Sequence, residues 1–181
     1  MNAPDVIATC ALLFTIGSFW WISARPGNLQ IIGEPRSYAF AAQGDLTLNL
    51  PLVFTNTGPL AAVATNLRLR LDVPGFPSFV PFVATHDAVQ PKEGGRDMAT
   101  SIVIQGRETR LICCEFIARP YEVSVAKATE IPASVEAFVV RPWRKPAWKP
   151  LLTFTLRLPA EVVTQRSQYL TYDNQPDVLV E

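Results

Sequence analysis

The longest uncharged stretch of the chain is a block of apolar residues close to its start. From Val6 to Ala24 no charged side chain interrupts the sequence. A helix of that length reaches roughly 28 Å, which is close to the ~30 Å hydrocarbon core of a bilayer. The polar residues inside the block do not form the stripe that an amphipathic core helix carries. The pattern therefore predicts a transmembrane helix over residues 6–24.

The ends of this block carry signals of their own. Asp5 is suited to capping the first turn, and the sequence Arg25-Pro26-Gly27 is suited to ending the helix. Trp20 and Trp21 precede Arg25 by about one turn, and indole rings favour the headgroup level of a membrane. We therefore assign Trp20, Trp21 and Arg25 to the membrane interface. A cleaved signal peptide is the main alternative, but MNAPD contains no basic residue, and the paired tryptophans fit a cleavage site poorly.

Beyond the apolar block the pattern changes to an alternation of apolar and polar residues. It is clearest in DLTLNLPLVFTN, TNLRLRLDV and LLTFTLRL, where every second residue is leucine, valine or phenylalanine. Alternation of this kind is typical of strands with one buried face. Further strands are expected at residues 37–42, 79–85, 100–105, 109–118 and 134–141. Together with sixteen prolines, these segments predict an all-β fold, an antiparallel β-sandwich of about 7–8 strands. An up-and-down barrel is the alternative.

One part of this pattern supports a resemblance. The run LPLVFTNTGPLAAVATNLRLRL, with its turn at Asn56-Thr57-Gly58, resembles the strand–turn–strand of immunoglobulin-like modules. Combined with an N-terminal span that ends in ARPG, the chain resembles bacterial single-pass membrane proteins that carry one such module. The resemblance implies a domain that binds or braces other proteins.

The predicted elements divide the chain into five parts. Residues 1–5 form a short flank, and residues 6–24 form the transmembrane helix. A linker over 25–36 leads to a β-sandwich domain over 37–160. Residues 161–181 are a C-terminal tail that is either an additional edge strand or a loose end.

Charge and cysteine content limit the partners and suggest an orientation. Sixteen basic and sixteen acidic residues give zero formal net charge, which argues against nucleic acid as a partner. Arg25 and Arg36 follow the apolar block and no cation precedes it, so the positive-inside rule places the N-terminus outside and the domain in the cytoplasm. Cys10 lies in the span, and neighbouring Cys113 and Cys114 offer no ordinary disulfide. The inverted topology, with the domain outside the cytoplasm, is the alternative.

No arrangement of residues in the sequence indicates catalysis, a cofactor or a metal. His86 is the single histidine, and we expect it to be a solvated loop residue. Because adjacent strand residues point to opposite faces, one of Cys113 and Cys114 should be buried and the other exposed. Glu93 and Asp97 lie in a polar loop and are expected to be solvated. We accordingly predict no enzyme activity and no small-molecule substrate.

The segment RPWRKPAWKP, residues 141–150, interleaves two tryptophans with cations. Such a loop can contact a partner protein or anionic lipid, because tryptophan and arginine are frequent in binding hot spots and at membrane interfaces. The simpler interpretation is a strand connection whose tryptophans cover one end of the domain. The candidate contact residues are Trp143, Arg144, Lys145, Trp148 and Lys149. A second apolar loop contains Phe76, Phe79 and Phe82, which either cap the core or form a contact patch.

These features together favour an interaction protein held at the membrane. We expect a structural or accessory subunit of a membrane protein complex, with the bilayer and other membrane proteins as its partners. An extracytoplasmic module that binds a ligand or envelope protein is the alternative, and an enzyme is a more remote one.

Overall fold

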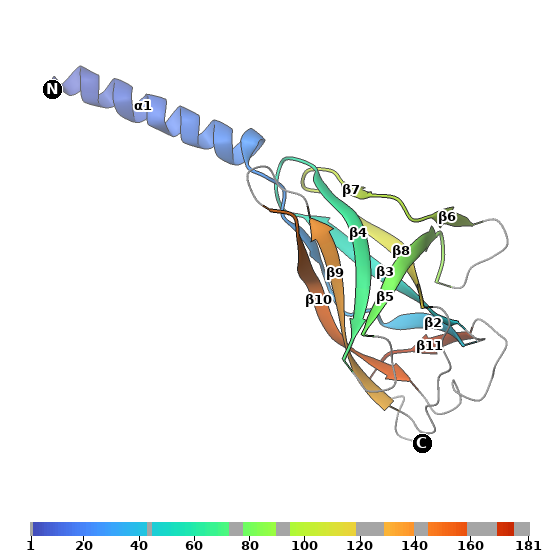
Figure 1. Cartoon of the computed structure of the whole chain (residues 1–181). Coiled ribbons are helices and arrows are strands. Elements are labelled where there is room, and N and C mark those ends of the chain that lie inside the picture. The colour runs from blue at the N-terminus through green and yellow to red at the C-terminus, as the bar shows by residue number, and fades with distance from the viewer. Residues whose placement is uncertain are drawn as a thin grey trace.

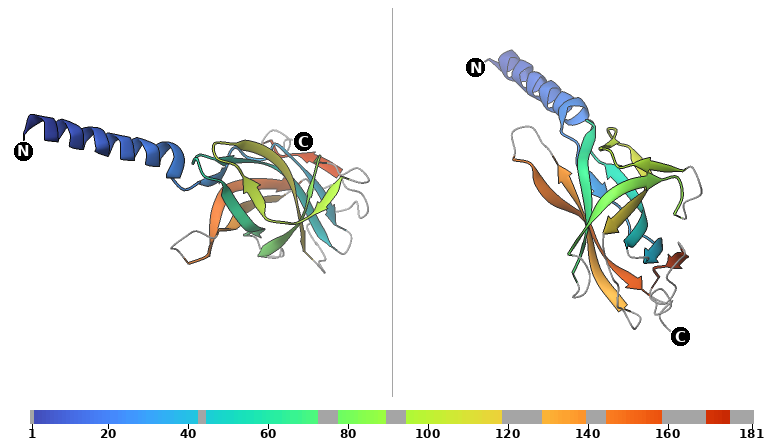
Figure 2. Two further views of the ribbon diagram at one scale, coloured as in Figure 1. Left: turned by 90° about the horizontal axis from the view of Figure 1, so that it is seen from above. Right: turned by 45° about the vertical axis from the view of Figure 1, so that its right-hand side comes forward.

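The computed structural model describes residues 2–42, 45–72, 78–89, 95–118, 129–139, 145–158 and 170–175. In this part of the chain a single long helix projects from a β domain (Figure 1). All strand pairs are antiparallel, and the strands belong to one sheet that curls until its two halves face each other (Figure 2). The predicted antiparallel β fold, preceded by one apolar helix, is confirmed.

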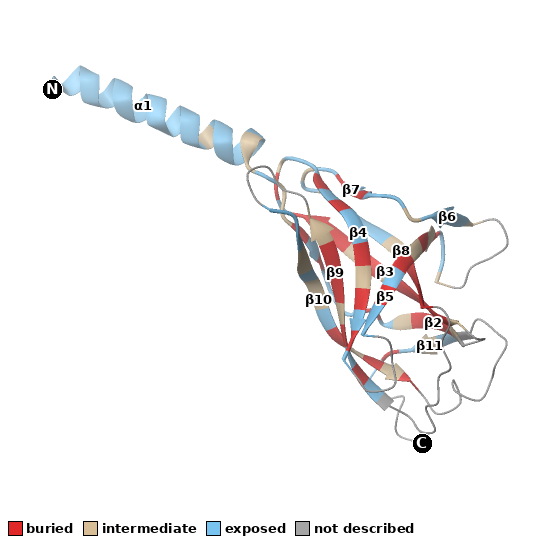
Figure 3. Cartoon of the chain, viewed as in Figure 1, coloured by how far each residue is buried: buried red, intermediate tan, exposed pale blue. Residues whose placement is uncertain are grey.

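The helix begins at Ala3 and ends at Ala24. It consists of α1 (Ala3–Phe19) and a final π-helical turn, η1 (Trp20–Ala24). The Asp5 carboxylate accepts a hydrogen bond from the backbone N–H of Asn2 at 3.4 Å, so it caps the first turn as expected. Arg25 has extended backbone, and the helix ends there. Within the described structure no residue of the helix is buried (Figure 3).

Among the described residues, eight strands form the main path of the sheet and three short strands pair at its sides. The path runs in the order β10-β9-β4-β5-β8-β3-β2-β11, while β1 pairs with β3, β6 with β5 and β7 with β4. The strands are β1 (Leu29–Ile31), β2 (Ser37–Ala42), β3 (Leu46–Asn56), β4 (Ala62–Leu71), β5 (Phe79–His86), β6 (Arg96–Met98), β7 (Ile102–Ile104), β8 (Thr109–Ala118), β9 (Thr129–Val139), β10 (Ala147–Leu158) and β11 (Leu170–Asp173).

The hydrophobic core lies between the two halves of the curled sheet, and the alternating residues fill it. Strand β3 contributes every second side chain from Leu46 to Phe54, each at most 1% exposed. Strand β4 supplies three leucines from the other half, and β10 supplies Phe154, Leu156 and Leu158. The period-two pattern therefore identified the core face of these strands correctly.

The face of β3 that points away from the core is not exposed to solvent, as its polar residues would suggest. Thr47, Asn49 and Thr55 are all buried although they alternate with the core residues. The side-chain amide of Asn49 donates hydrogen bonds to the carbonyl oxygens of Ala88 and Val89, at 3.2 and 2.7 Å. The segment that follows β5 is thereby held over this face. Asn49, whose position resembles a solvent face in the sequence, consequently lies under this covering segment, whereas Thr55 contacts the Thr109 hydroxyl on β8.

Some strand boundaries differ from the expected ones. Strand β10 starts at Ala147, inside the predicted loop of residues 141–150, and β9 starts at Thr129. The register of β10 against β9 shifts between Pro150 and Leu152, so that a bulge interrupts the alternation at the very point where the loop was expected to end. Strands β1 and β6 are three residues each and lie in stretches with no strand pattern. The tail contributes an edge strand, β11, which pairs with β2.

Side chains join the two ends of the sheet. The Asn174 side chain accepts a hydrogen bond from the Arg157 backbone N–H at 2.8 Å and donates one to the Thr155 carbonyl at 3.0 Å. The Tyr38 hydroxyl donates to the carbonyl of Arg157. The asparagine amide therefore pairs with β10 as a neighbouring strand would, and it satisfies part of an otherwise open edge.

Candidate functional site

The helix meets the β domain at a compact junction made of three connecting segments. Residues 25–28 lead from the helix to β1, residues 57–61 connect β3 to β4, and residues 105–108 connect β7 to β8. All three lie at the end of the domain from which the helix projects (Figure 2). Of the residues that the sequence assigned to the membrane interface, this junction contains Arg25, while Trp20 and Trp21 lie in the helical turn directly before it.

Two arginines link the helix to the domain. Arg25 donates a hydrogen bond through Nη2 to the Thr57 carbonyl at 2.8 Å, and its guanidinium lies 4.2 Å from the centre of the Trp21 ring. Arg107 donates through Nη2 to the Ile22 carbonyl in the last turn of the helix, at 3.0 Å. The Trp20 and Trp21 rings are neighbours, with 6.4 Å between their centres. Trp20, Trp21 and Arg25 thus lie where the helix ends, and Arg107 is an additional junction residue.

Asn56 connects all three segments through its buried side chain. Its Oδ1 accepts hydrogen bonds from the backbone N–H groups of Asn28 and Gly58, at 3.1 and 3.0 Å. Its Nδ2 donates to the carbonyl oxygens of Leu60, Ile104 and Gln105, between 2.8 and 3.2 Å. A polar side chain that is 1% exposed is stable only with such partners. The Asn56-Thr57-Gly58 turn noted in the sequence is therefore the centre of the junction.

Three glycines allow these segments to approach one another closely. A Cβ on Gly58 would lie 2.6 Å from the backbone of Gly27, and one on Gly27 would lie 2.5 Å from the Leu60 carbonyl oxygen. A Cβ on Gly106 would lie 1.8 Å from the carbonyl oxygen of Pro59. Because there is no room for side chains, backbone packs directly on backbone. The helix is consequently joined to the domain by a packed, hydrogen-bonded joint.

Arg107 occupies a backbone conformation that favours glycine. Its φ is +58°, and the Glu108 N–H closes the turn onto the Gln105 carbonyl at 3.3 Å. A left-handed conformation costs a residue with a side chain about 1 kcal/mol. The neighbouring glycine, Gly106, is needed one position earlier, where it contacts Pro59. The turn therefore bears some strain to place an arginine beside the helix end.

The predicted contact segment 141–150 is partly outside the described residues, and Trp143 and Arg144 belong to the part that is not described. Trp148 lies on β10 and is half-buried, with its ring 5.4 Å from that of Phe138. Lys149 donates a hydrogen bond to the Asn28 side chain at 3.1 Å, which brings it to the junction. Lys145 is exposed. Trp148 thus packs on the outside of the domain, while Lys149 contacts the segment below the helix.

Trp148 is part of a stack that covers the outer face of β4. The Arg68 guanidinium lies between the rings of Phe79 and Trp148, at 4.0 and 4.1 Å from their centres, and pairs with the Glu136 carboxylate at 2.6 Å. Phe79 is 46% exposed, whereas Phe82 is buried in the core. Phe76 lies outside the described residues. Because the Arg68 guanidinium stacks on the Trp148 ring and pairs with Glu136, this cluster holds β4, β9 and β10 together.

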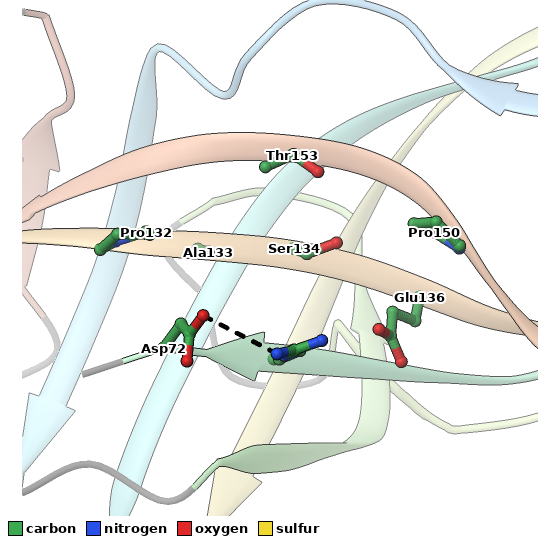
Figure 4. Close-up of a pocket in the computed structure, with 8 residues that line it drawn as sticks. Asp72, Pro132, Ala133, Ser134, Glu136, Pro150 and Thr153 are labelled. Carbon is green, nitrogen blue, oxygen red and sulfur yellow. Dashed lines mark ion pairs between the residues drawn. The ribbon is translucent and has the colours of Figure 1, made fainter. Parts of the chain in front are cut away.

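A shallow hollow of about 290 Å³ lies beside this stack on the outer face of the same strands (Figure 4). Four of its five polar side chains already have partners within the domain, the fifth being the exposed Thr153. Arg70 pairs with Asp72 at 3.7 Å, the Ser134 hydroxyl donates to the Leu152 carbonyl at 3.1 Å, and Glu136 pairs with Arg68. The hollow therefore offers a shaped polar surface, without an activated nucleophile or a proton-transfer pair among the residues that line it.

The expectation of a solvated loop histidine is wrong. His86 is the last residue of β5 and is 7% exposed. Its Nε2 lies 3.4 Å from Oε1 of Glu115, whose other oxygen lies 2.7 Å from Nη2 of Arg96. Strand pairing causes this arrangement, because β5 pairs with both β6 and β8 and brings the three residues together on the outer face. The His86 and Glu115 side chains are only 2% and 5% exposed, and the covering segment held by Asn49 begins directly after His86.

The expected division of the two cysteines between core and surface is also wrong. Cys114 points into the core and Cys113 to the opposite face, but both are buried, at 0% and 4% exposure. Burial raises the pKa of the Cys113 thiol, and the nearby Asp87 carboxylate raises it further. Burial likewise raises the pKa of Cys114. His86 pairs directly with Cys113 across the strands, yet these surroundings favour the neutral thiol over a reactive thiolate.

Asp97 lies on the short strand β6 and is exposed, as expected, while Glu93 is outside the described residues. In the described ranges no group of three or more histidine, cysteine, aspartate or glutamate residues is arranged to hold a metal ion. Neither the family models nor the curated proteins searched include a match to this chain. The junction, with its two arginines and two tryptophans at the helix end, is therefore the most distinctive candidate site that the structure offers.

Proposed function

We propose that this chain is a single-pass membrane protein whose β domain serves as an interaction module, a scaffold or accessory subunit of a membrane protein complex. One observation carries the proposal. The helix Ala3–Ala24 is long and apolar enough to cross a bilayer, and none of it is buried in the described structure. Apolar side chains such as Leu13 and Phe14, at 64% and 77% exposure, require an apolar environment that the β domain does not provide.

The junction supports a retained helix over a cleaved leader. The Ile22 carbonyl accepts a hydrogen bond from Arg107, and Arg25 donates one to Thr57. The end of the helix is thus integrated with turns of the domain that lie far away in the sequence. A segment destined for removal has no need of such contacts.

A notch on the helix supports the role of an accessory subunit. Phe14, Trp21 and Ile22 surround a depression at Gly17 and Ser18, where a Cβ added to the glycine would meet no described side chain within 4 Å. Small residues at such a position allow a second transmembrane helix to approach closely. The hydroxyl of Thr15 is already satisfied, because it donates to the Ala11 carbonyl. The opposite side of the helix, which includes Leu12, is then left to face lipid.

The orientation that we propose places the domain in the cytoplasm. Arg25 and Arg36 follow the span in the sequence, and the fold adds Arg107 and Lys149 at the junction. Cations beside the end of a span favour the cytoplasmic side. Protease treatment of sealed inverted vesicles and of spheroplasts distinguishes the two topologies. A domain that is cleaved only in spheroplasts would favour the alternative, an extracytoplasmic binding module.

The anchor is tested with two matched leucines. Leu13 on the helix and Leu111 on β8 are similarly exposed, at 64% and 61%. Leu13→Arg places a charge at the centre of the span, at a cost of about 3 kcal/mol or more, and we expect the full chain to leave the membrane fraction that survives an alkaline carbonate wash. Leu111→Arg should leave the chain in that fraction. Equal behaviour of the two variants, or a wild-type chain in the soluble fraction, would refute the membrane anchor.

The interaction role is tested at the notch. A photo-crosslinking amino acid at Ser18 should yield one discrete protein adduct in cells, whereas the same group at Leu12, on the opposite helix face, should react with lipid. A chain that runs alone after mild solubilisation and gives no adduct from Ser18 would contradict the accessory-subunit proposal, even if the anchor itself is correct.

A further inference from the structure

The junction fixes the depth of part of the β domain relative to the helix. Arg107 lies 3.0 Å from the Ile22 carbonyl and Arg25 lies one residue beyond the helix end. If Trp20 and Trp21 lie at the headgroup level, the turn that carries Arg107 lies at that level as well. The same holds for the loop of Leu60, because its carbonyl oxygen lies 2.8 Å from the Asn56 amide at the centre of the junction. These turns cannot stand away from the bilayer on a loose tether.

The junction, together with the described residues that continue it on β8 and lead into β10, is strongly cationic. In the described segments 25–28, 57–61, 105–110 and 145–149 the basic residues are Arg25, Arg107, Arg110, Lys145 and Lys149, and the acidic one is Glu108. The Glu108 carboxylate accepts a hydrogen bond from the Gln105 N–H at 2.8 Å. A local excess of positive charge close to a membrane attracts lipids of net negative charge.

Arg25 and Arg107 have donor groups that the domain does not use. Among the described residues neither arginine forms an ion pair with a carboxylate. Nε of Arg25 is buried and has no hydrogen-bond partner within that part of the chain. Each guanidinium carries five N–H donors, of which the junction occupies one. Arg25 is half-buried and Arg107 is exposed, so the unused donors of Arg107 are open to a ligand at the surface of the junction. The planar fork of a guanidinium matches the geometry of a phosphate.

From these observations we propose that the junction is a binding site for the phosphate headgroups of acidic phospholipids. Arg25 and Arg107 hold a lipid phosphate at the end of the helix, Trp20 and Trp21 lie beside it, and Leu60, at 47% exposure, enters the interface between headgroups and acyl chains. This proposal rests on the membrane anchor proposed above. The headgroup site adds to the anchor a β domain that contacts the lipid surface in a fixed orientation. Arg107, and the backbone strain in its turn, then serve lipid binding.

The first measurement is depth in the bilayer. The full chain with Cys10→Ala is reconstituted in nanodiscs, and a nitroxide label is placed at Leu60→Cys or, as a distant exposed control, at Met98→Cys. The label at residue 60 should collide more often with oxygen, which dissolves in lipid, than with a water-soluble nickel chelate, and the label at residue 98 should do the reverse. Two labels that are both accessible to the nickel chelate would overturn the proposal.

The second measurement is lipid selectivity. Nanodiscs of phosphatidylcholine mixed with phosphatidylglycerol are prepared, and the lipids that remain bound to the full chain are counted by native mass spectrometry. Wild-type protein should be enriched in phosphatidylglycerol over the bulk mixture. Arg107→Gln should reduce the enrichment about fivefold, the factor expected for one cation near a charged surface. Arg70→Gln, on the outer face of β4 away from the junction, should leave it unchanged.

The outcomes separate this proposal from the anchor itself. A wild-type chain that does not float with vesicles refutes the membrane anchor. A chain that floats, but shows no enrichment or an equal loss for Arg107→Gln and Arg70→Gln, refutes only the headgroup site. Arg107→Lys retains the charge and provides the folding control, and it should preserve most of the enrichment.

Discussion

Two segments of this chain are nearly free of charge, and they lie in opposite surroundings. Strand β3 (Leu46–Asn56) is the centre of the domain, with most of its side chains buried on both faces, whereas no residue of the helix Ala3–Ala24 is buried within the described structure (Figure 3). The rest of the β domain covers the side chains of β3, whereas the described part of the domain leaves those of the helix exposed. The hydrophobicity of a segment therefore does not show whether its apolar side chains face the protein core or the surroundings. The spacing of the apolar residues along the segment does. Alternation indicates a face that the protein itself will cover, and an unbroken block indicates an environment outside the protein.

The largest expected effect comes from the same substitution in both segments. Phe54→Ala removes a fully buried ring from β3 and should lower the free energy of unfolding of the β domain by about 3–5 kcal/mol. Phe14→Ala removes a ring that is 77% exposed in the described structure and should leave that free energy unchanged. Urea unfolding of the full chain in detergent, followed by tryptophan fluorescence, measures both. A domain that loses stability with Phe14→Ala would show that the helix packs on the domain after all.

A second pair of variants compares buried and exposed charge within the β domain. Glu115→Gln removes the carboxylate that His86 and Arg96 share beneath the covering segment, and we expect a loss of about 2–3 kcal/mol in unfolding free energy. Glu130→Gln removes an ion pair to Arg157 whose carboxylate is 59% exposed, with an expected effect below about 0.5 kcal/mol. The unfolding free energies of both variants are measured at neutral pH by urea unfolding. If both substitutions cost the same, the covering segment does not exclude water from the cluster.

The third prediction concerns the joint where the two regions meet. Asn56→Ala leaves two N–H groups and three carbonyl oxygens without their shared partner, and should cost about 2 kcal/mol. Asn66→Ala removes one hydrogen bond, to the adjacent Leu67 N–H, from an exposed side chain and should cost less than about 0.5 kcal/mol. Amide hydrogen exchange should in addition show faster exchange at Gly58 in the first variant only. Equal protection at Gly58 in both would mean that the backbone contacts of the glycines suffice to hold the joint.

The sequence was sufficient to predict the class of fold because each relevant signal is local. The alternation in residues 46–54 depends only on neighbours two apart, and the apolar block depends only on its own length. The surroundings of His86 depend instead on which strands pair and in what register, since Arg96, Cys113 and Glu115 reach it from β6 and β8. No pattern within a few residues of position 86 encodes those distances.

The junction likewise contains residues that local sequence patterns could not identify. Trp20, Trp21 and Arg25 were assigned to the interface because they lie at the end of the apolar block. Arg107 follows the helix by more than eighty residues, and its role appears only when the turn between β7 and β8 is placed against Ile22. Its one local signal is an arginine after a glycine in a short turn, a position where the chain adopts a left-handed conformation. That signal is too common in turns to indicate a contact with a membrane helix.

The smallest expected effect on stability tests whether the joint sets the orientation of the two regions. Arg107→Gly relieves a backbone strain of about 1 kcal/mol but increases the entropy of the unfolded chain by a similar amount, so the unfolding free energy should change by less than about 0.5 kcal/mol. The contact with the Ile22 carbonyl is nevertheless lost. Pulsed electron spin resonance between labels at Cys10 and Met98→Cys should therefore give a broader distance distribution in Arg107→Gly than in the labelled protein that retains Arg107. Arg107→Asn, which tolerates the same backbone conformation but cannot reach the helix, should broaden it equally. If neither variant changes the distribution, then Arg25, Asn56 and the packed glycines fix the orientation without Arg107, and the strain in its turn would be explained by lipid binding alone.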